Sequence, residues 1–317
     1  MLDVSQLLQA FFLLSAATLL LINSIPAFRY RYIAYGARAT EVQPTQSHEL
    51  TEPADQSVQK SATRSGSIIE QVLDFFATIQ VPHGYFQHFY LVSLLSSVFW
   101  AYQLLAKGWL LQYICQQEGI DGPRKGMSVD QVSLAWSFMG VQGLRRLLES
   151  STLARSSASK MWFVHWLLGI AFYLAVGISV WVEGAGALLS ADSLSNDITW
   201  SAPSLKTMIS VPIFILASGV QHDCHAYLAS LPKYTLPVHP IFQLLVCPHY
   251  TAECLIYLSL AIISAPRGAV VNRTLFTALV FVTINLSVTA ATSKEWYQRK
   301  FGREAVAQRW KMIPFVY

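Results

Sequence analysis

Seven separate stretches of the sequence are apolar for about 20 residues, the length that an α-helix needs to cross a lipid bilayer. Of the 317 residues, 53% are hydrophobic and 13% are charged, so the chain is far more apolar than a soluble domain of this size. The sequence therefore predicts an all-α integral membrane protein, a bundle of seven transmembrane helices. The predicted spans are residues 7–27, 86–106, 128–148, 161–182, 207–228, 241–264 and 274–293.

The basic residues indicate how this bundle is oriented. If the N-terminus is lumenal, sixteen of the 22 Lys and Arg residues fall on the cytosolic side, as the positive-inside rule requires. All eight histidines fall on that side as well. The first span follows no basic residue and is longer than the apolar part of a signal peptide, so we expect it to be retained. We predict a lumenal N-terminus and a functional site that faces the cytosol.

Composition divides the chain into three parts. Residues 1–39 would form the first transmembrane helix and its basic flank. Residues 40–68 are rich in Gln, Ser, Thr and Pro and predict a flexible cytoplasmic linker without a core of its own. Residues 69–317 would form a six-helix core with a cytoplasmic C-terminal tail.

Several familiar signatures are missing from the sequence. The four cysteines form no CxxC pair, and the histidine spacings do not predict a metal site. A complete GxGxxG motif is also missing, so any bound dinucleotide would be held by helices instead of a Rossmann unit. The net charge of +4 is explained by the basic cytosolic margins and predicts no nucleic-acid partner. Asn272 lies in an N-glycosylation sequon, and the sequence does not decide whether this asparagine carries a glycan.

Polar residues collect at the predicted cytosolic ends of the spans. In "CPHYTAECLIY", His249 and Glu253 are four residues apart and would share a helix face. In "VQGLRRLLES", Arg145 and Arg146 carry guanidinium groups that suit a phosphate-bearing ligand. Ionisable groups at membrane depth are costly, and their default interpretation is functional. A buried Glu253 would need a partner such as His249 or Arg145.

Five motifs together resemble the steroid 5-alpha-reductase family, and specifically its polyprenol reductase branch. They are "VPHGYFQHFY", "QGLRRLLES", "QHDCHAYLASL", "CPHYTAECLIY" and the terminal "KEWYQRKF" with "IPFVY", and they run in the family's order from about residue 80 to the end. The resemblance implies a seven-helix enzyme of the endoplasmic reticulum membrane that binds NADPH among its helices. This branch saturates the alpha-isoprene unit of polyprenoids on the route to dolichol, which carries glycans for protein N-glycosylation.

The resemblance also implies site residues. The residues expected to bind the cofactor are Arg145, Arg146, Gln221, His222, His225, Tyr234, His249, Tyr250, Glu253, Lys294 and Tyr297. Steroid-reducing members hold the substrate carbonyl with a glutamate and a tyrosine. At those positions this sequence has His88 or Phe89 and Gln142.

The chemistry of the reaction favours an aldehyde substrate. Hydride addition to a C=C bond needs an electron sink, which an allylic alcohol lacks and an enal provides at its oxygen. We therefore expect polyprenal to be reduced, with a donor within hydrogen-bond reach of that oxygen. His88 is the first candidate for the catalytic donor and Tyr90 the second. Because a polyprenoid tail stays in the bilayer, the pocket should open sideways, near the aromatic-rich residues 86–100.

Other functions remain open from the sequence. A membrane methyltransferase of the isoprenylcysteine type, using S-adenosylmethionine, also places a His-Pro-x-Tyr-like turn before a glutamate. Here the order is Pro248-His249-Tyr250, and the expected downstream Arg-Tyr and Glu-Glu elements are missing. A reductase of 3-oxo-4-ene steroids and a non-enzymatic lipid-binding protein are further alternatives. The expected partners are a polyprenoid lipid and the bilayer, and no protein partner is predicted.

Overall fold

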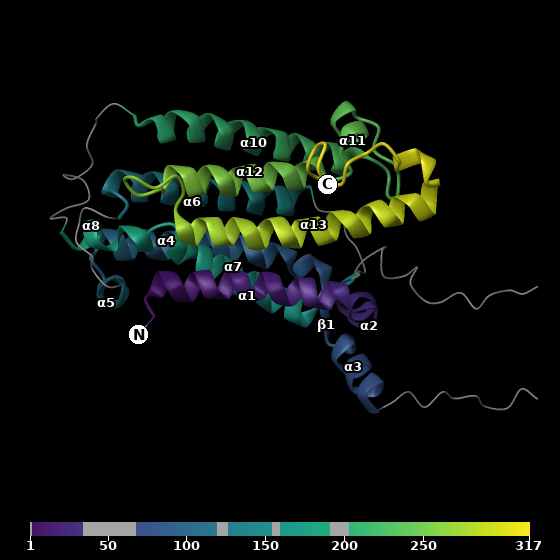
Figure 1. Cartoon of the computed structure of the whole chain (residues 1–317), viewed down its shortest axis with the longest axis horizontal. Helices are drawn as coiled ribbons and strands as arrows, with labels where there is room; N and C mark the ends of the chain where they lie inside the picture. The colour runs from purple at the N-terminus through teal and green to yellow at the C-terminus, as the bar shows by residue number, and fades with distance from the viewer. Residues whose placement is uncertain (1, 34–67, 119–125, 154–158, 191–202) are drawn as a thin grey trace, which may run out of the picture.

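The computed structural model describes residues 2–33, 68–118, 126–153, 159–190 and 203–317. This part of the chain is a bundle of long helices that run side by side, with short helices at the bundle ends (Figure 1). The main elements are α1 (Val4–Ser24), α3 (Ile68–Thr78), α4 (Gln87–Leu105), α5 (Trp109–Gln117), α6 (Val129–Thr152), α7 (Phe163–Ser179), α8 (Ala185–Ser190), α10 (Leu205–Ser230), α11 (Pro240–Leu244), α12 (Pro248–Ile263) and α13 (Arg273–Phe301). Short turns complete it: α2 (Pro26–Phe28), η1 (Arg29–Ile33), η3 (His83–Phe86), η4 (Val182–Gly184) and η5 (Glu304–Val306).

Each predicted span overlaps one of the long helices α1, α4, α6, α7, α10, α12 and α13. Among the described residues, four helical segments are long and apolar enough to cross a membrane by length and composition: Val4–Ser24, His83–Leu105, Phe163–Ser190 and Arg273–Phe301. The remaining three of the seven long helices, α6, α10 and α12, contain Arg145, His225 and Glu253, respectively. Because α12 has 16 residues, it is also shorter than a full crossing requires.

The predicted span 241–264 is wrong as a single helix. Helix α11 ends at Leu244, and α12 begins only at Pro248. Between them, Val246 N donates to Trp310 O at 2.8 Å and Cys247 N donates to Lys311 O at 3.0 Å. The C-terminal segment therefore takes the hydrogen bonds that a continuous helix would have used, and Pro248 starts the new helix where its missing N–H costs nothing.

Hydrogen bonds show which helix ends lie together. At one end of the bundle Gln87 Nε2 donates to Ser150 O at 2.9 Å, and Arg29 pairs with Glu295 at 2.6 Å. At the same end the antiparallel strands β1 (Gln80–Pro82) and β2 (Lys160–Trp162) join the starts of α4 and α7. We call this the β1–β2 end. The starts of α4, α7 and α12 and the ends of α1, α6, α10 and α13 gather there, as the sequence predicted for the polar helix ends.

The opposite end is closed by acidic and amide caps. Glu183 Oε1 accepts bonds from Thr274 N at 2.9 Å and Thr274 Oγ1 at 2.7 Å, at the start of α13. Asn272 caps the same helix through Leu275 N at 2.9 Å, and its side chain is fully buried. Such caps satisfy the free N–H groups of a helix start. The Asn272 amide is thus a structural element inside the fold.

Of the predicted linker 40–68, all but residue 68 lies outside the described residues. Residue 68 begins α3, a helix that the sequence analysis did not predict.

Candidate functional site

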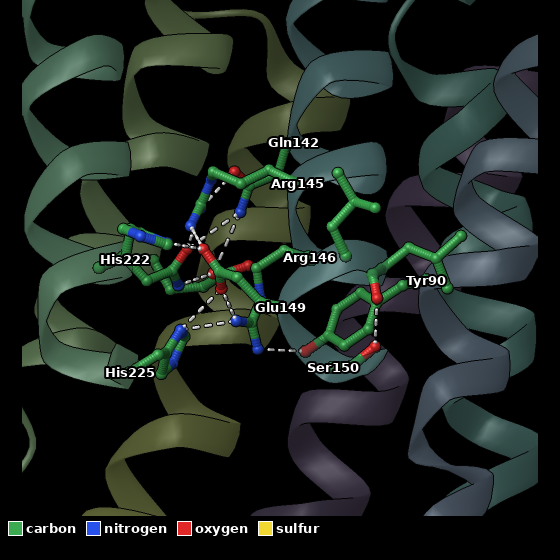
Figure 2. Close-up of polar contacts among 12 residues, drawn as sticks. Tyr90, Gln142, Arg145, Arg146, Glu149, Ser150, His222 and His225 are labelled. Carbon is green, nitrogen blue, oxygen red and sulfur yellow. Dashed lines mark hydrogen bonds and ion pairs between the residues drawn. The ribbon is translucent and has the colours of Figure 1, made fainter. Parts of the chain in front are cut away.

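A buried carboxylate near the end of α6 is the centre of the polar cluster (Figure 2). Glu149 is 5% exposed, and its two oxygens accept bonds from Arg145 Nη1 and Arg146 Nη1. Glu149 follows these arginines by four and three residues, so the three side chains share one helix face. From α10, His222 Nδ1 lies 2.9 Å and His225 Nδ1 3.0 Å from the same carboxylate. Four nitrogen-bearing side chains thus converge on a single anion.

The polar cluster around Glu149 is connected to Glu253 through the side-chain amides of two glutamines. Arg145 Nη2 donates to Gln142 Oε1 at 2.8 Å and also to Gln221 Oε1. Gln221 Nε2 donates to Glu253 Oε2, and Gln142 Nε2 lies 3.4 Å from that oxygen. The predicted direct pairing of Glu253 with His249 or Arg145 is therefore replaced by amide donors. Both amide side chains are buried, which makes their hydrogen bonds important for the local fold.

Arg146 also reaches the second candidate donor. Its Nη2 donates to Tyr90 Oη at 2.6 Å, and its guanidinium lies 4.7 Å from the centre of the Tyr90 ring. Tyr90 is 5% exposed. Because the phenol oxygen accepts the bond from Arg146, the phenol's own hydrogen is left for another acceptor. Tyr90 is thus a polarised hydroxyl held beside a fixed positive charge.

His88 lies away from this cluster. Its ring packs against Tyr85 at 4.5 Å and Trp166 at 6.1 Å between ring centres, and it does not line the cavity described below. Residues two apart on a helix point to nearly opposite sides, so only one of His88 and Tyr90 can face the bundle interior. The structure brings Tyr90 to the ionic cluster and places His88 outside it.

A cavity of about 230 Å³ borders the cluster. One part of its wall is polar and includes Arg146, Gln221 and Glu253. The rest is largely apolar and aromatic, including Phe89, Leu168, Phe172, Phe281 and Val288 from the three helices α4, α7 and α13. An internal cavity with one polar and one oily side suits a lipid that carries a polar head.

Two buried nitrogen atoms at this site have no hydrogen-bond partner. They are His249 Nδ1 and Arg145 Nε, and His249 itself lines the cavity. The His249 ring lies 4.3 Å from that of Tyr250 and 5.4 Å from that of His225. A buried polar atom without a partner is costly. Of the two, His249 Nδ1 is therefore the atom available to a ligand that enters the cavity.

The remaining predicted cofactor residues lie toward the C-terminal segment. Lys294 Nζ donates to Arg309 O at 2.5 Å, and Tyr297 packs in one apolar cluster with Tyr250 and Met312. Tyr234 is largely exposed, and Lys300 Nζ lies 4.4 Å above its ring. These three residues, Tyr234, Lys294 and Tyr297, do not line the cavity, and we call them the outer group. The predicted cofactor residues that line the cavity are called the inner group: Arg146, Gln221, His225, His249, Tyr250 and Glu253.

Arg309 fastens the outer group to the bundle. Its Nη1 donates to Pro237 O at 2.9 Å and to Phe242 O at 3.0 Å. Burial lowers the pKa of Arg309 from its ordinary value. The C-terminal segment is thereby held against the α10–α12 connection, close to the inner group.

Glu149 is the main site residue that was missing from the predicted set. Its spacing from Arg145 and Arg146 could have indicated two ion pairs on one helix face. The contacts of His222 and His225 with Glu149 could not have been predicted from the sequence, because these histidines follow Glu149 by 73 and 76 residues. No group of three or more His, Cys, Asp or Glu side chains in the described part of the chain is placed to hold a metal ion.

The fold and cavity define a helical membrane protein with an internal, partly ionic ligand site at one end of its bundle. A family model described as 3-oxo-5-alpha-steroid 4-dehydrogenase matches residues 159–317, and the chain belongs to this family, the steroid 5-alpha-reductases, which are oxidoreductases. The matched range contains Gln221, His225, His249 and Glu253, whereas Tyr90 and the α6 residues precede it.

The proteins to which this chain is similar in sequence include several polyprenal reductases. The chain is 29% identical over 258 residues to the polyprenal reductase of Saccharomyces cerevisiae, and the aligned region covers 81% of each protein. It is 27% identical over 276 residues to that of Xenopus laevis, covering 80% of this chain and 82% of the relative. The Homo sapiens polyprenal reductase is 26% identical over 245 residues, covering 70% of this chain and 73% of the relative.

Proposed function

We propose that this protein reduces the alpha-isoprene double bond of polyprenal with NADPH and so supplies the dolichol series for protein N-glycosylation. The proposal is supported by membership of an oxidoreductase family and by the similarity to proteins named polyprenal reductase. The cavity supports it further, because its polar and oily sides match the two parts of a polyprenal. The proposed location is the endoplasmic reticulum membrane, with seven spans, a lumenal N-terminus and the β1–β2 end toward the cytosol.

The contact that carries the proposal is the bond from Arg146 to Tyr90 at the edge of the cavity. In the proposed reaction Tyr90 donates a hydrogen bond to the aldehyde oxygen, where negative charge develops. Arg146 keeps the phenol polarised and stabilises that charge. Glu149 holds Arg146 in place through a buried ion pair. Tyr90 therefore replaces His88 as the preferred donor.

The donors of the inner group fit a nicotinamide cofactor. His249 Nδ1 is buried at the cavity wall without a partner, and Gln221, His225, Tyr250 and Glu253 offer further polar atoms along that wall. When bound, NADPH would supply a hydride to the beta carbon of the enal, and uptake of one proton from water at the alpha carbon would complete the saturated aldehyde. Tyr234, Lys294 and Tyr297 of the outer group would hold the rest of the cofactor at the cytosolic face.

The guanidinium groups of Arg145 and Arg146 are already engaged by Glu149, Gln221 and Tyr90. They are thus better suited to orienting side chains around the reacting groups than to gripping phosphates. Basic residues around the C-terminal segment, such as Lys300 beside Tyr234, are the alternative phosphate ligands.

Reduction of a 3-oxo-4-ene steroid is the second candidate, because the matching family model is described as a steroid dehydrogenase. Where steroid-reducing members carry a tyrosine for the substrate carbonyl, this chain has Gln142. Its amide bonds to Gln221 and Arg145, and it does not line the cavity. This arrangement favours the polyprenoid. Membership of a reductase family disfavours the methyltransferase alternative.

The test is a product analysis with the purified full-length protein in lipid vesicles. Polyprenal, polyprenol and a 3-oxo-4-ene steroid would each be incubated with NADPH or NADH carrying deuterium at the transferred position. We expect deuterium in the saturated aldehyde from polyprenal with NADPH, and none in polyprenol. Transfer only to the steroid would support the second candidate. Incorporation into no lipid, or methyl transfer from S-adenosylmethionine, would refute the proposal.

A further inference from the structure

Helix α3 exposes an apolar stripe that no other part of the described chain covers. Ile68, Val72, Phe75 and Phe76 fall on one side of the helix and are 80%, 47%, 65% and 50% exposed. The acidic residues Glu70 and Asp74 lie on the other side of the helix, and Gln71 and Thr78 lie at the border between the two sides. A short helix with separate apolar and charged faces is typical of segments that lie in the plane of a membrane surface.

The bundle holds α3 by its other side. Arg31 Nε donates to Asp74 Oδ1 at 2.6 Å, and Tyr32 Oη donates to Leu73 O at 2.9 Å. Trp162 Nε1 donates to Phe76 O at 2.9 Å. These bonds come from η1 and β2, so the apolar stripe is left facing away from the bundle. In Figure 1, α3 projects to the side at the β1–β2 end and crosses the direction in which the long helices run.

The position of α3 in the chain indicates what covers this stripe. The turn η1 follows the candidate span Val4–Ser24, and β1 leads into the candidate span His83–Leu105. Exposed apolar side chains continue from α3 through Ile79 to Tyr85 and Phe86, at the start of that second span. The stripe is therefore continuous with the exposed apolar surface of a candidate membrane span.

The same contacts connect α3 to the cavity. Tyr32 and Trp162, which bond to α3, stack on each other with ring centres 4.3 Å apart. Ile33, which follows Tyr32, and Met161, which precedes Trp162, line the cavity. Helix α3 is thus fastened to the outer side of a wall whose inner side is the cavity.

We propose that α3 lies in the polar–apolar boundary of the bilayer, with its apolar stripe inserted, and holds the adjoining cavity wall at the depth of the lipid headgroups. A polyprenoid kept in the bilayer presents its polar end at that depth, so α3 would align the cavity with its substrate. The second part of this proposal rests on the proposed function, whereas the membrane position of α3 does not.

The position is tested with spin labels on the full-length protein in phosphatidylcholine vesicles. Phe75→Cys reports the apolar stripe, and Glu70→Cys on the polar face is the matched control. The native cysteines are buried or half-buried, and the signal of the labelled wild-type protein is subtracted. We expect the label at position 75 to collide mainly with oxygen and the label at 70 with a water-soluble nickel complex. Equal nickel access at both positions would overturn the proposal. Strong label–label coupling at 75 would also do so, because it would show that a second copy covers the stripe.

The functional part is tested with Phe75→Asp and, as a control that also changes the charge by one unit but on the polar face, Glu70→Gln. We expect the first substitution to raise the KM for polyprenal in vesicles several-fold and to leave kcat with a short, water-soluble enal unchanged. The control should change neither. Equal KM values in both variants would overturn this part. If the wild-type protein reduces no enal, the proposed function fails, but the spin-label result still decides where α3 lies.

Discussion

The ion-pair cluster makes a quantitative prediction for Glu149→Gln. The substitution removes the one negative charge that Arg145 and Arg146 share, in a place where Glu149 is 5% exposed and the arginine side chains are 20% and 13% exposed. Removing one partner of a buried ion pair costs about 3 to 5 kcal/mol, because the other charge stays buried without compensation. The glutamine keeps one acceptor, so we expect a loss of about 3 kcal/mol in the free energy of unfolding.

The same substitution should lower catalysis through Tyr90. Without Glu149, Arg146 loses the contact that keeps it on the phenol, and the developing charge on the substrate oxygen loses an oriented donor. Loss of one such donor typically lowers kcat by about 10²- to 10³-fold. Since the effect is transmitted through Tyr90, the double variant Glu149→Gln/Tyr90→Phe should be no slower than Tyr90→Phe alone.

The measurement is a double-mutant cycle on kcat at saturating polyprenal, together with thermal unfolding in the same detergent. Glu295→Gln serves as the matched control, because it removes a carboxylate from the more exposed Arg29 pair at the same end of the bundle. We expect that control to cost less than about 1 kcal/mol and to leave kcat unchanged. Independent, multiplicative losses in the double variant would refute the role given to Glu149.

Three further predictions address other parts of the molecule. Tyr90→Phe should lower kcat about 100-fold or more with cofactor affinity retained, whereas His88→Ala should keep most of its activity; the reverse order of kcat values would restore His88 as the donor. Asn272→Gln should lower the melting temperature, because the fully buried cap of α13 is worth about 1 kcal/mol, and glycosidase treatment of the wild-type protein should not shift its mobility in gels. Gly169→Ala should destabilise the protein by about 1 to 3 kcal/mol in thermal unfolding, since the added methyl group would lie 2.5 Å from the Phe89 ring, and wild-type stability would contradict the tight α4–α7 packing.

Local sequence features determined much of the architecture. Apolar stretches of sufficient length predicted where the long helices lie, because a chain in a bilayer must satisfy its backbone hydrogen bonds within each segment. Helical spacing placed Glu253 and His249 on one helix face, and the placement of the basic residues indicated that the polar helix ends share one end of the bundle. The motifs also predicted the family.

Other features depended on contacts between segments far apart in the sequence. Pairing of residues 246 and 247 with the C-terminal segment broke the predicted helix 241–264, and α3 was fixed by contacts with η1 and β2. The assembly of Glu149 with His222 and His225 required α6 and α10 to pack together.

The choice between His88 and Tyr90 shows the physical reason most directly. Helical periodicity tells which residues share a face, but the rotation of a helix about its own axis is decided by all of its neighbours together. The close approach of α7 at Gly169 to Phe89, with Arg146 reaching across from α6, turned Tyr90 inward and His88 outward. The sequence determined which residues could act, and tertiary packing decided which of them meet.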